Sequence, residues 1–161
     1  MCTFINQSNI LSQIAHTDIE TYKVVKIKGD RWFAPYRKCE YRDKHICDVI
    51  DNPDYYGKIY DDIWGEPQSV YAISRGIHSF ISVIDAIDNA TYLDMNFSKM
   101  DENYVVVKSI IPEGSIYYNG YNELRTYKLL EPSYVSNHLI LGDDTNIVYK
   151  PDKLNKKLYF V

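Results

Sequence analysis

Hydrophobic and polar residues follow a strand-like pattern over several short segments of this chain. Residues 19–27 are rich in β-branched side chains and partly alternate, which predicts a β-strand. Residues 104–111 are almost continuously β-branched, which predicts a strand at the centre of a sheet. Residues 134–141 predict a further strand, and Asn119-Gly120 is a hairpin signal by composition. The pattern therefore favours a strand-rich fold.

Helical spacing of apolar residues is clear in one place and weaker in another. The isoleucines and alanines of residues 80–92 predict a helix with one apolar face, and Ser82 with Asp85 resembles a capping box at its start. Residues 10–15 predict a second, short N-terminal helix or a packed arm. We expect an α+β fold, with a twisted, mainly antiparallel sheet and one or two helices. Residues 1–142 are expected to form a single globular domain, and residues 143–161 a C-terminal extension packing on it.

Composition narrows the classes of function. The chain has 161 residues, of which 16 are Tyr, a residue type that favours strands and leaves a polar tip at a surface or pocket. A net charge of −4 argues against general nucleic-acid binding, because neutralising phosphates needs clustered Lys and Arg. No apolar run is long enough to span a membrane, and the N-terminus does not resemble a signal peptide. We expect a cytoplasmic protein without membrane association.

The cysteines predict neither a disulfide framework nor a metal site. Cys2, Cys39 and Cys47 are odd in number, and without an export signal free thiols are expected. His45 lies between the last two, but zinc sites usually include more closely spaced ligands. We therefore expect no metal and no cofactor.

The main candidate site is the segment that contains Arg75, Gly76, His78 and Ser79. It is interpreted as a strand, a glycine turn and the start of the helix at 80–92. A helix N-terminus attracts anions, so this interpretation predicts an anion-binding site made by a cation, an imidazole and a hydroxyl. The alternative is that His78 is a hydrogen-bonded structural residue and Ser79 only a helix cap.

Aromatic residues would complete such a site. Tyr22, Tyr36 and Tyr118 are candidates for contacting a ligand, because aromatic side chains can stack on a nucleotide base. The alternative is that they are ordinary sheet and core residues. No nucleophile with a neighbouring base, P-loop or dinucleotide-binding motif is present in the sequence, so no catalytic residue is predicted.

The order of several short motifs resembles a group of small uncharacterised proteins of gut Bacteroides-type bacteria and their phages. The resemblance covers residues 1–142 and implies no activity. It rests on these motifs: Met1-Cys2, Tyr22-Lys23-Val24, Ala34-Pro35-Tyr36, Gly76-Ile77-His78-Ser79-Phe80, and residues 107–114 and 134–141.

The same order is similar to the core of ADP-ribosyltransferase-like folds, in which a turn feeds a helix beside the nicotinamide pocket. The resemblance implies an NAD-related ligand. The catalytic glutamate motif of those enzymes has no counterpart here, because Glu113 lies in a Pro-Glu-Gly turn and Glu123 has no partner pattern. A related fold would therefore be a binding-only version.

Three functions remain open at this point. The first is a non-catalytic binding protein of phage or mobile-element origin that holds a nucleotide-like or ADP-ribose-like anion and sequesters a host immune signal. The second is an ADP-ribosyltransferase-like enzyme that uses NAD. The third is a protein–protein interaction module, such as a phage inhibitor of a host protein or a virion component. A homo-oligomer is compatible with all three.

Overall fold

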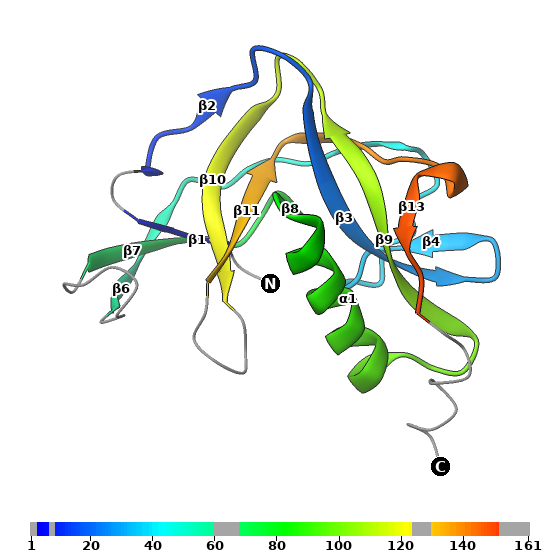
Figure 1. Ribbon diagram of the computed structural model, residues 1–161. Helices are drawn as coiled ribbons and strands as arrows, with labels where there is room; N and C mark the ends of the chain where they lie inside the picture. The colour runs from blue at the N-terminus through cyan, green and yellow to red at the C-terminus, as the bar shows by residue number, and fades with distance from the viewer. Residues whose placement is uncertain (1–2, 7–8, 60–67, 124–129, 152–161) are drawn as a thin grey trace.

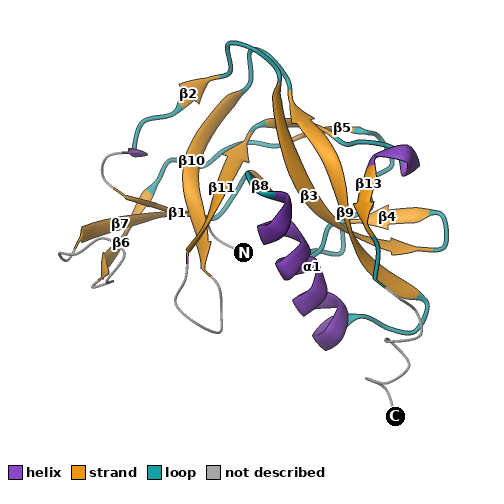
Figure 2. Cartoon of the chain, in the orientation of Figure 1, coloured by secondary structure: helices purple, strands orange, loops and turns teal. Residues whose placement is uncertain are grey.

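The computed structural model describes residues 3–6, 9–59, 68–123 and 130–151. Within them the chain forms the helix α1, the short 3-10 helix η2 and thirteen strands, and the strands are all joined in one sheet (Figures 1 and 2). The elements in chain order are β1 (Thr3–Asn6), β2 (Gln13–Ile14), β3 (Ile19–Lys28), β4 (Arg31–Phe33), β5 (His45–Cys47), β6 (Asp54–Ile59), β7 (Gln68–Ile73), β8 (Ile77–Phe80), α1 (Val83–Phe97), β9 (Glu102–Ile111), β10 (Ile116–Glu123), β11 (Leu130–Ser136), β12 (His138–Ile140), η2 (Asp144–Asn146) and β13 (Ile147–Tyr149).

The sheet is antiparallel at every pairing among the described strands. Its order is β5-β12-β9-β3-β8-β11-β10-β1-β7-β6, with β13 on β9, β2 on β10 and β4 on β3. The longest pairing joins β3 to β9 over their whole length, with Val24 opposite Val106 and Val25 opposite Val105. The expected α+β class with a mainly antiparallel sheet is confirmed.

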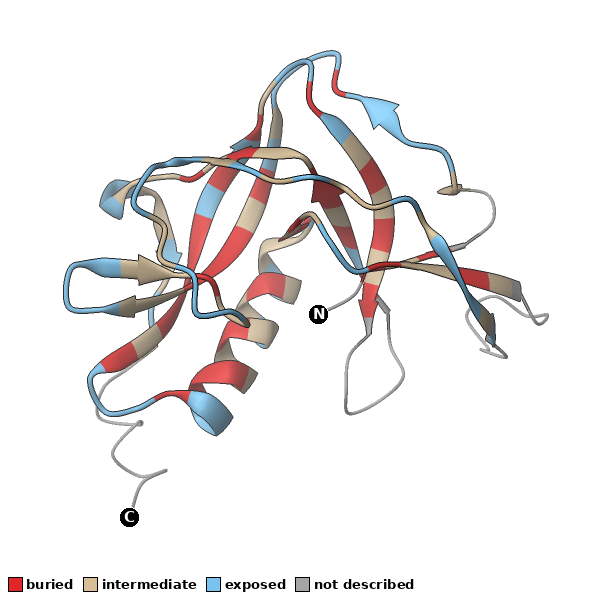
Figure 3. Cartoon of the chain, turned by 180° about the vertical axis from the view of Figure 1, so that it is seen from behind, coloured by how far each residue is buried: buried red, intermediate tan, exposed pale blue. Residues whose placement is uncertain are grey.

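The two faces of the β3–β9 pair carry different parts of the core because successive side chains of a strand point to opposite faces. On one face, Val24 and Val106 pack with Phe80 and with the apolar face of α1. On the other, residues such as Val25 and Val105 form a second cluster. Figure 3 shows the buried residues on these central strands and along one side of α1. The candidate site takes Lys23 and Ile77 from the face that carries Val25, and Tyr36 from the side of α1.

The start of the helix differs from the sequence prediction. The expected helix at 80–92 begins at Val83 and ends at Phe97, with the Ser82 side chain accepting a hydrogen bond from the Ile84 amide. Phe80 belongs to β8, whose residues pair with β11. Phe80 fits the spacing of apolar residues in a helix, but its backbone pairs with β11 in the sheet.

Residues 10–15 are expected from the sequence to form a short N-terminal helix or a packed arm, and the helix is wrong. Gln13–Ile14 form the short strand β2 on β10, and the amide of Ala15 donates to the carbonyl of Ser115. Leu11 is 81% exposed and Ile14 is 59% exposed, whereas Ala15 is a core residue, so only part of the apolar spacing there faces a core. Near the other end of the described chain, β13 pairs with β9. No helix in the described ranges is long and apolar enough to cross a membrane.

Candidate functional site

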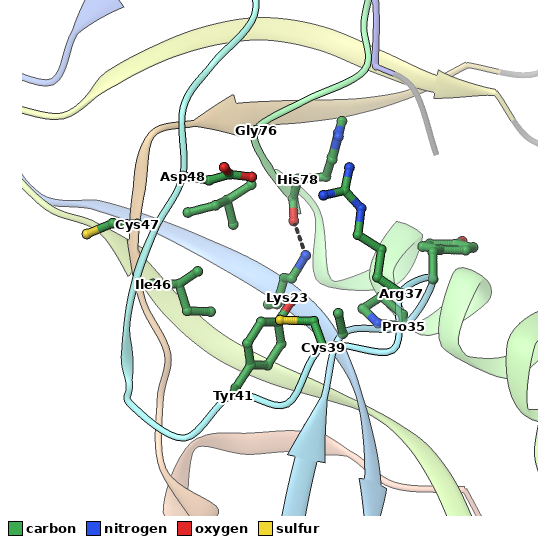
Figure 4. Close-up of a pocket in the computed structure, with 13 residues that line it drawn as sticks. Lys23, Pro35, Arg37, Cys39, Tyr41, Ile46, Cys47, Asp48, Gly76 and His78 are labelled. Atoms are coloured by element: carbon green, nitrogen blue, oxygen red, sulfur yellow. Dashed lines mark hydrogen bonds between the residues drawn. The ribbon is translucent and has the colours of Figure 1, made fainter.

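A cavity of about 340 Å³ lies between β3, the start of β8 and the two segments around residues 34–41 and 46–48 (Figure 4). Its volume is at the lower end of the range for pockets that hold small ligands. Its lining combines apolar and aromatic side chains with charged ones: Lys23, Ala34, Pro35, Tyr36, Arg37, Cys39, Tyr41, Ile46, Cys47, Asp48, Gly76, Ile77 and His78.

The loop that carries Arg37 is held by its own backbone. Ala34 donates to the carbonyl of Cys39 and Tyr41 donates to that of Trp32, each at 2.8 Å, so the chain leaves β4 and returns beside it. Pro35 within the loop has a fixed φ and no amide to leave unpaired. The loop therefore forms an ordered side of the cavity.

Lys23 places an ammonium group against the cavity from the buried face of β3. Its side chain is 7% exposed, and its Nζ donates a hydrogen bond of 2.7 Å to the carbonyl oxygen of His78. An ammonium has three donors, and no carboxylate pairs with Lys23 in the described part of the chain. Burial, and secondarily the charge of Arg37, lower the pKa of Lys23 to about 8. Among the described residues, no anion compensates this buried cation.

His78 is neutral and only partly satisfied. Its Nδ1 lies 2.5 Å from the hydroxyl oxygen of Thr3, whereas its Nε2 is buried and has no hydrogen-bond partner among the described residues. Burial, together with the nearby charge of Lys23, lowers the pKa of His78 to about 3. A neutral imidazole with one unpaired nitrogen can still donate to or accept from a ligand.

Two arginines lie at the rim of the cavity, and they differ in how strongly each guanidinium is paired with other protein groups. The Nε of Arg75 is 3.1 Å from the Oδ1 of Asp48, which also accepts from the amide of Val49. Within the described ranges, the hydrogen bond of Arg37 is a long contact of 3.5 Å to the carbonyl of Ser74, and Figure 4 shows its guanidinium turned toward His78. The carboxylate of the cavity is therefore already neutralised, which leaves Lys23 and Arg37 as excess positive charge.

The cavity brings together three of the residues that the sequence predicts as ligand contacts. Tyr36, Gly76 and His78 line it, and the hydroxyl of Tyr36 is hydrogen-bonded to the side chain of Asn89 on α1. Arg75 lies beside the cavity through its ion pair with Asp48.

The other three predicted residues lie outside the cavity lining. Ser79 is 1% exposed, and its hydroxyl has no partner among the described residues. The hydroxyl of Tyr22 donates to the Glu20 carboxylate at 3.1 Å, while the ring packs in the cluster under α1. Tyr118 is a core residue beside Ile5 and Val135. Tyr22 and Tyr118 therefore have the surroundings of ordinary sheet and core residues.

The predicted placement of His78 and Ser79 at a helix N-terminus is wrong, because both belong to β8 and the helix cap is Ser82. The positive charge comes from side chains that sequence reasoning did not select, namely Lys23 and Arg37. The sequence contains a pattern that points to a buried Lys23. Lys23 alternates with Thr21 and Val25 on one face of a predicted strand, and the structure buries both of those neighbours fully.

The thiols near the cavity are free. Cys39 and Cys47 are both exposed, and Figure 4 shows the sulfur of Cys47 pointing away from Lys23. His45 lies against His138, with a distance of 5.7 Å between the ring centroids. Cys2 is outside the described residues.

Comparisons with protein-family models, with curated proteins and with solved structures find no match to this chain. The resemblance to small Bacteroides and phage proteins, and the similarity to ADP-ribosyltransferase-like folds, therefore stay predictions.

Proposed function

We propose that this protein is a binding protein without catalytic activity, and that it holds a small nucleotide-like or ADP-ribose-like anion in the cavity over Lys23. The observation that carries the proposal is the buried ammonium of Lys23 beside Arg37, at a site whose carboxylate, Asp48, is paired with Arg75. A buried charge is costly unless a partner of opposite sign compensates for it. An anionic ligand would supply that partner.

The walls of the cavity suit a ligand that has a flat, apolar part as well as a charge. Tyr36 is anchored by Asn89, and Ala34, Pro35 and Ile77 provide apolar surface nearby. Stacking of a base on an aromatic ring contributes about 1–3 kcal/mol in single-stranded nucleic-acid sites. The combination of two cations and an aromatic wall favours a nucleotide over inorganic phosphate.

Recognition is favoured over ADP-ribosyl transfer by the carboxylates at the site. Among the described residues that line the cavity, Asp48 carries the only carboxylate, and it is engaged by Arg75 and by the Val49 amide. No glutamate lines this part of the structure to act on a bound NAD. In a phage or a mobile element, we propose that such a protein sequesters a host immune signal of nucleotide chemistry.

Thermal unfolding with a panel of ligands tests the proposal. The panel contains AMP, ADP-ribose, NAD, cyclic mono- and dinucleotides and inorganic phosphate. A true ligand should raise the melting temperature in a saturable way, with a gain of about 2.7 kcal/mol at roughly 100-fold excess over Kd. Absence of a shift with every organic member of the panel would contradict it. Release of nicotinamide from NAD would instead support the transferase.

Matched variants locate the binding. Arg37→Gln should weaken the bound nucleotide about ten-fold or more, because one of two cations is lost. Arg42→Gln is the control, since Arg42 is 85% exposed and does not line the cavity. Equal losses in the two variants would show that the effect is general electrostatics and not this site.

Proton uptake gives a second measurement. An anion beside Lys23 would raise the pKa of Lys23 from about 8, so binding near pH 8.5 should take up a proton. Calorimetric titrations in buffers of different ionisation enthalpy measure that uptake. The uptake should be absent in Lys23→Met even if some affinity remains.

A further inference from the structure

Three carboxylates from distant parts of the sequence meet beside the start of α1. Asp85 and Asp88 lie on the first turns of the helix, and Glu131 lies on β11. The chain is held together here by the amide of Ile81, which donates to the carbonyl of Pro132 at 3.4 Å. One carboxylate oxygen from each of the three acids lies within 4.8 Å of the others. This cluster shares no residue with the lining of the cavity over Lys23.

Glu131 is the member that makes this cluster more than an acidic surface. Its side chain is 3% exposed, and its Oε1 is buried without a hydrogen-bond partner among the described residues. None of the ion pairs formed within the described ranges involves Glu131, Asp85 or Asp88. Native proteins rarely leave a buried carboxylate oxygen unpaired beside two other acids. No group in the described part of the chain satisfies this oxygen.

More unsatisfied polar groups lie on the same face of the sheet. Asn122 on β10 is directly opposite Glu131, and Ser133 lies two residues further along β11. In an antiparallel pair these positions share one face. Both side chains are buried, and neither the amide of Asn122 nor the hydroxyl of Ser133 has a hydrogen-bond partner in the described part of the chain. The group therefore offers further neutral oxygens next to the carboxylates.

We propose that Asp85, Asp88 and Glu131 bind a hard divalent cation of the Ca²⁺ type, with the side-chain oxygen of Asn122 as a further ligand. Oxygen ligands alone, and several carboxylates, are what Ca²⁺ and Mg²⁺ select in proteins. Two oxygens on opposite sides of Ca²⁺ are about 4.6–5.2 Å apart, whereas around Mg²⁺ they are about 4.0–4.2 Å apart. Carboxylate oxygens within 4.8 Å of one another are close enough to share one cation after small shifts, and the longer bonds and flexible coordination of Ca²⁺ suit such a site better than the short octahedral bonds of Mg²⁺.

The cation would join α1 to β11. The helix otherwise packs against β3, β8 and β9, which lie to one side of β11 in the sheet. A metal held by Glu131 and by the helix carboxylates would add a link across that boundary. Binding should therefore stabilise the folded protein, since the cation binds the folded arrangement and not the separated ligands of the unfolded chain.

Calorimetric titration of the full chain with CaCl₂ tests the site, after treatment with EDTA and at pH 8 to limit competition by protons. MgCl₂, MnCl₂ and ZnCl₂ are the parallel titrations. We expect saturable binding of one Ca²⁺, weaker binding of Mg²⁺, and a melting temperature that rises with Ca²⁺ concentration. No saturable binding of Ca²⁺, or binding of Zn²⁺ alone, would overturn the proposal.

Variants decide whether the binding is at this cluster. Asp88→Asn should weaken Ca²⁺ about ten-fold or more, because it removes one of three charged ligands. Asp88 is exposed, so the change leaves the core in place. Glu131→Gln keeps the shape of the side chain and should abolish the binding. Glu113→Gln, in an exposed turn elsewhere, should bind Ca²⁺ as the native protein does. If Glu131→Gln binds Ca²⁺ with native affinity, the proposal is wrong.

Discussion

The ammonium of Lys23 donates a 2.7 Å hydrogen bond to the backbone carbonyl of His78, which joins the third strand to the eighth beneath the cavity. The same two residues are the most strongly perturbed basic groups of the site, because burial disfavours the charged form of each. Their backbones belong to neighbouring strands of the sheet, so the sheet fixes the positions from which both side chains start. Both groups make the stability of the protein depend on pH.

Lys23 should make the folded protein more stable as the solution becomes alkaline. The pKa of Lys23 is lowered from 10.5 to about 8, so between these values the unfolded chain binds the proton that the folded chain has lost. Stability rises with pH wherever the unfolded state binds more protons. Relative to Lys23→Met, the free energy of unfolding of the native protein should rise by roughly 3 kcal/mol from pH 8 to 10.5. Urea unfolding of both proteins measures this, and parallel pH profiles would contradict it.

His78 should destabilise the protein in acid. Its pKa is lowered from 6.5 to about 3, so below pH 6.5 the unfolded chain takes up a proton that the folded chain does not. Stability therefore falls as the pH decreases from 6.5 toward 3, by on the order of 2 kcal/mol at pH 4 when the partial exposure of the residue is allowed for. His78→Gln should remove this part of the acid sensitivity.

Nuclear magnetic resonance can follow the same ring directly. The His78 imidazole should remain neutral at pH 5, with one nitrogen unprotonated. A titration midpoint near 6.5 for this ring would show that it is solvated, and the explanation based on burial would then be wrong.

The central strands could be predicted from the sequence because their signal is local. Residues 19–27 and 104–111 are rich in β-branched side chains, and they form β3 (Ile19–Lys28) and β9 (Glu102–Ile111). Asn119-Gly120 has the composition of a hairpin turn, but both residues lie inside β10. A Cβ on Gly120 would clash with the side chain of Thr3, so this glycine allows the close approach of two strands that are distant in sequence.

The candidate site could be predicted only in part. The sequence predicts that Gly76 and His78 form a turn before a helix, whereas residues Ile77–Phe80 form a strand that pairs with β11. No local pattern reveals that pairing, because the partner lies more than fifty residues further along the chain. Lys23 and Arg37 come from two further segments, and they meet His78 only once the sheet is assembled.

The helix cap offers a direct test of where α1 begins. Ser82→Ala removes the hydroxyl that accepts from the Ile84 amide at 3.2 Å, and should lower the free energy of unfolding by about 1 kcal/mol. Ser82→Asn retains an oxygen that can cap the helix and should recover most of that loss. Equilibrium unfolding in urea measures both. Equal stability of the alanine variant and the native protein would show that the helix does not depend on this cap.

Gly76 combines a backbone and a packing requirement at the wall of the cavity. Its φ of +144° is a conformation that side-chain-bearing residues rarely adopt. An added Cβ would lie 3.3 Å from a methyl group of Val135 and 3.4 Å from the Cγ1 of Ile50. Val135 is fully buried and has little room to move. Gly76→Ala should therefore destabilise the protein by about 2 kcal/mol or more, from backbone strain and displaced neighbours together.

Gly57 is a matched control for that prediction, because its φ is +153° and an added Cβ would meet nothing within 4 Å. Gly57→Ala should incur only the backbone strain, of about 1 kcal/mol. The difference between the two variants in urea unfolding isolates the contact with Val135 and Ile50. Because Gly76 also lines the cavity, its alanine variant should bind the nucleotide more weakly, whereas Gly57→Ala should leave the affinity unchanged. Equal destabilisation by the two substitutions would mean that the wall around Gly76 yields freely, and that the cavity is less rigid than its packing indicates.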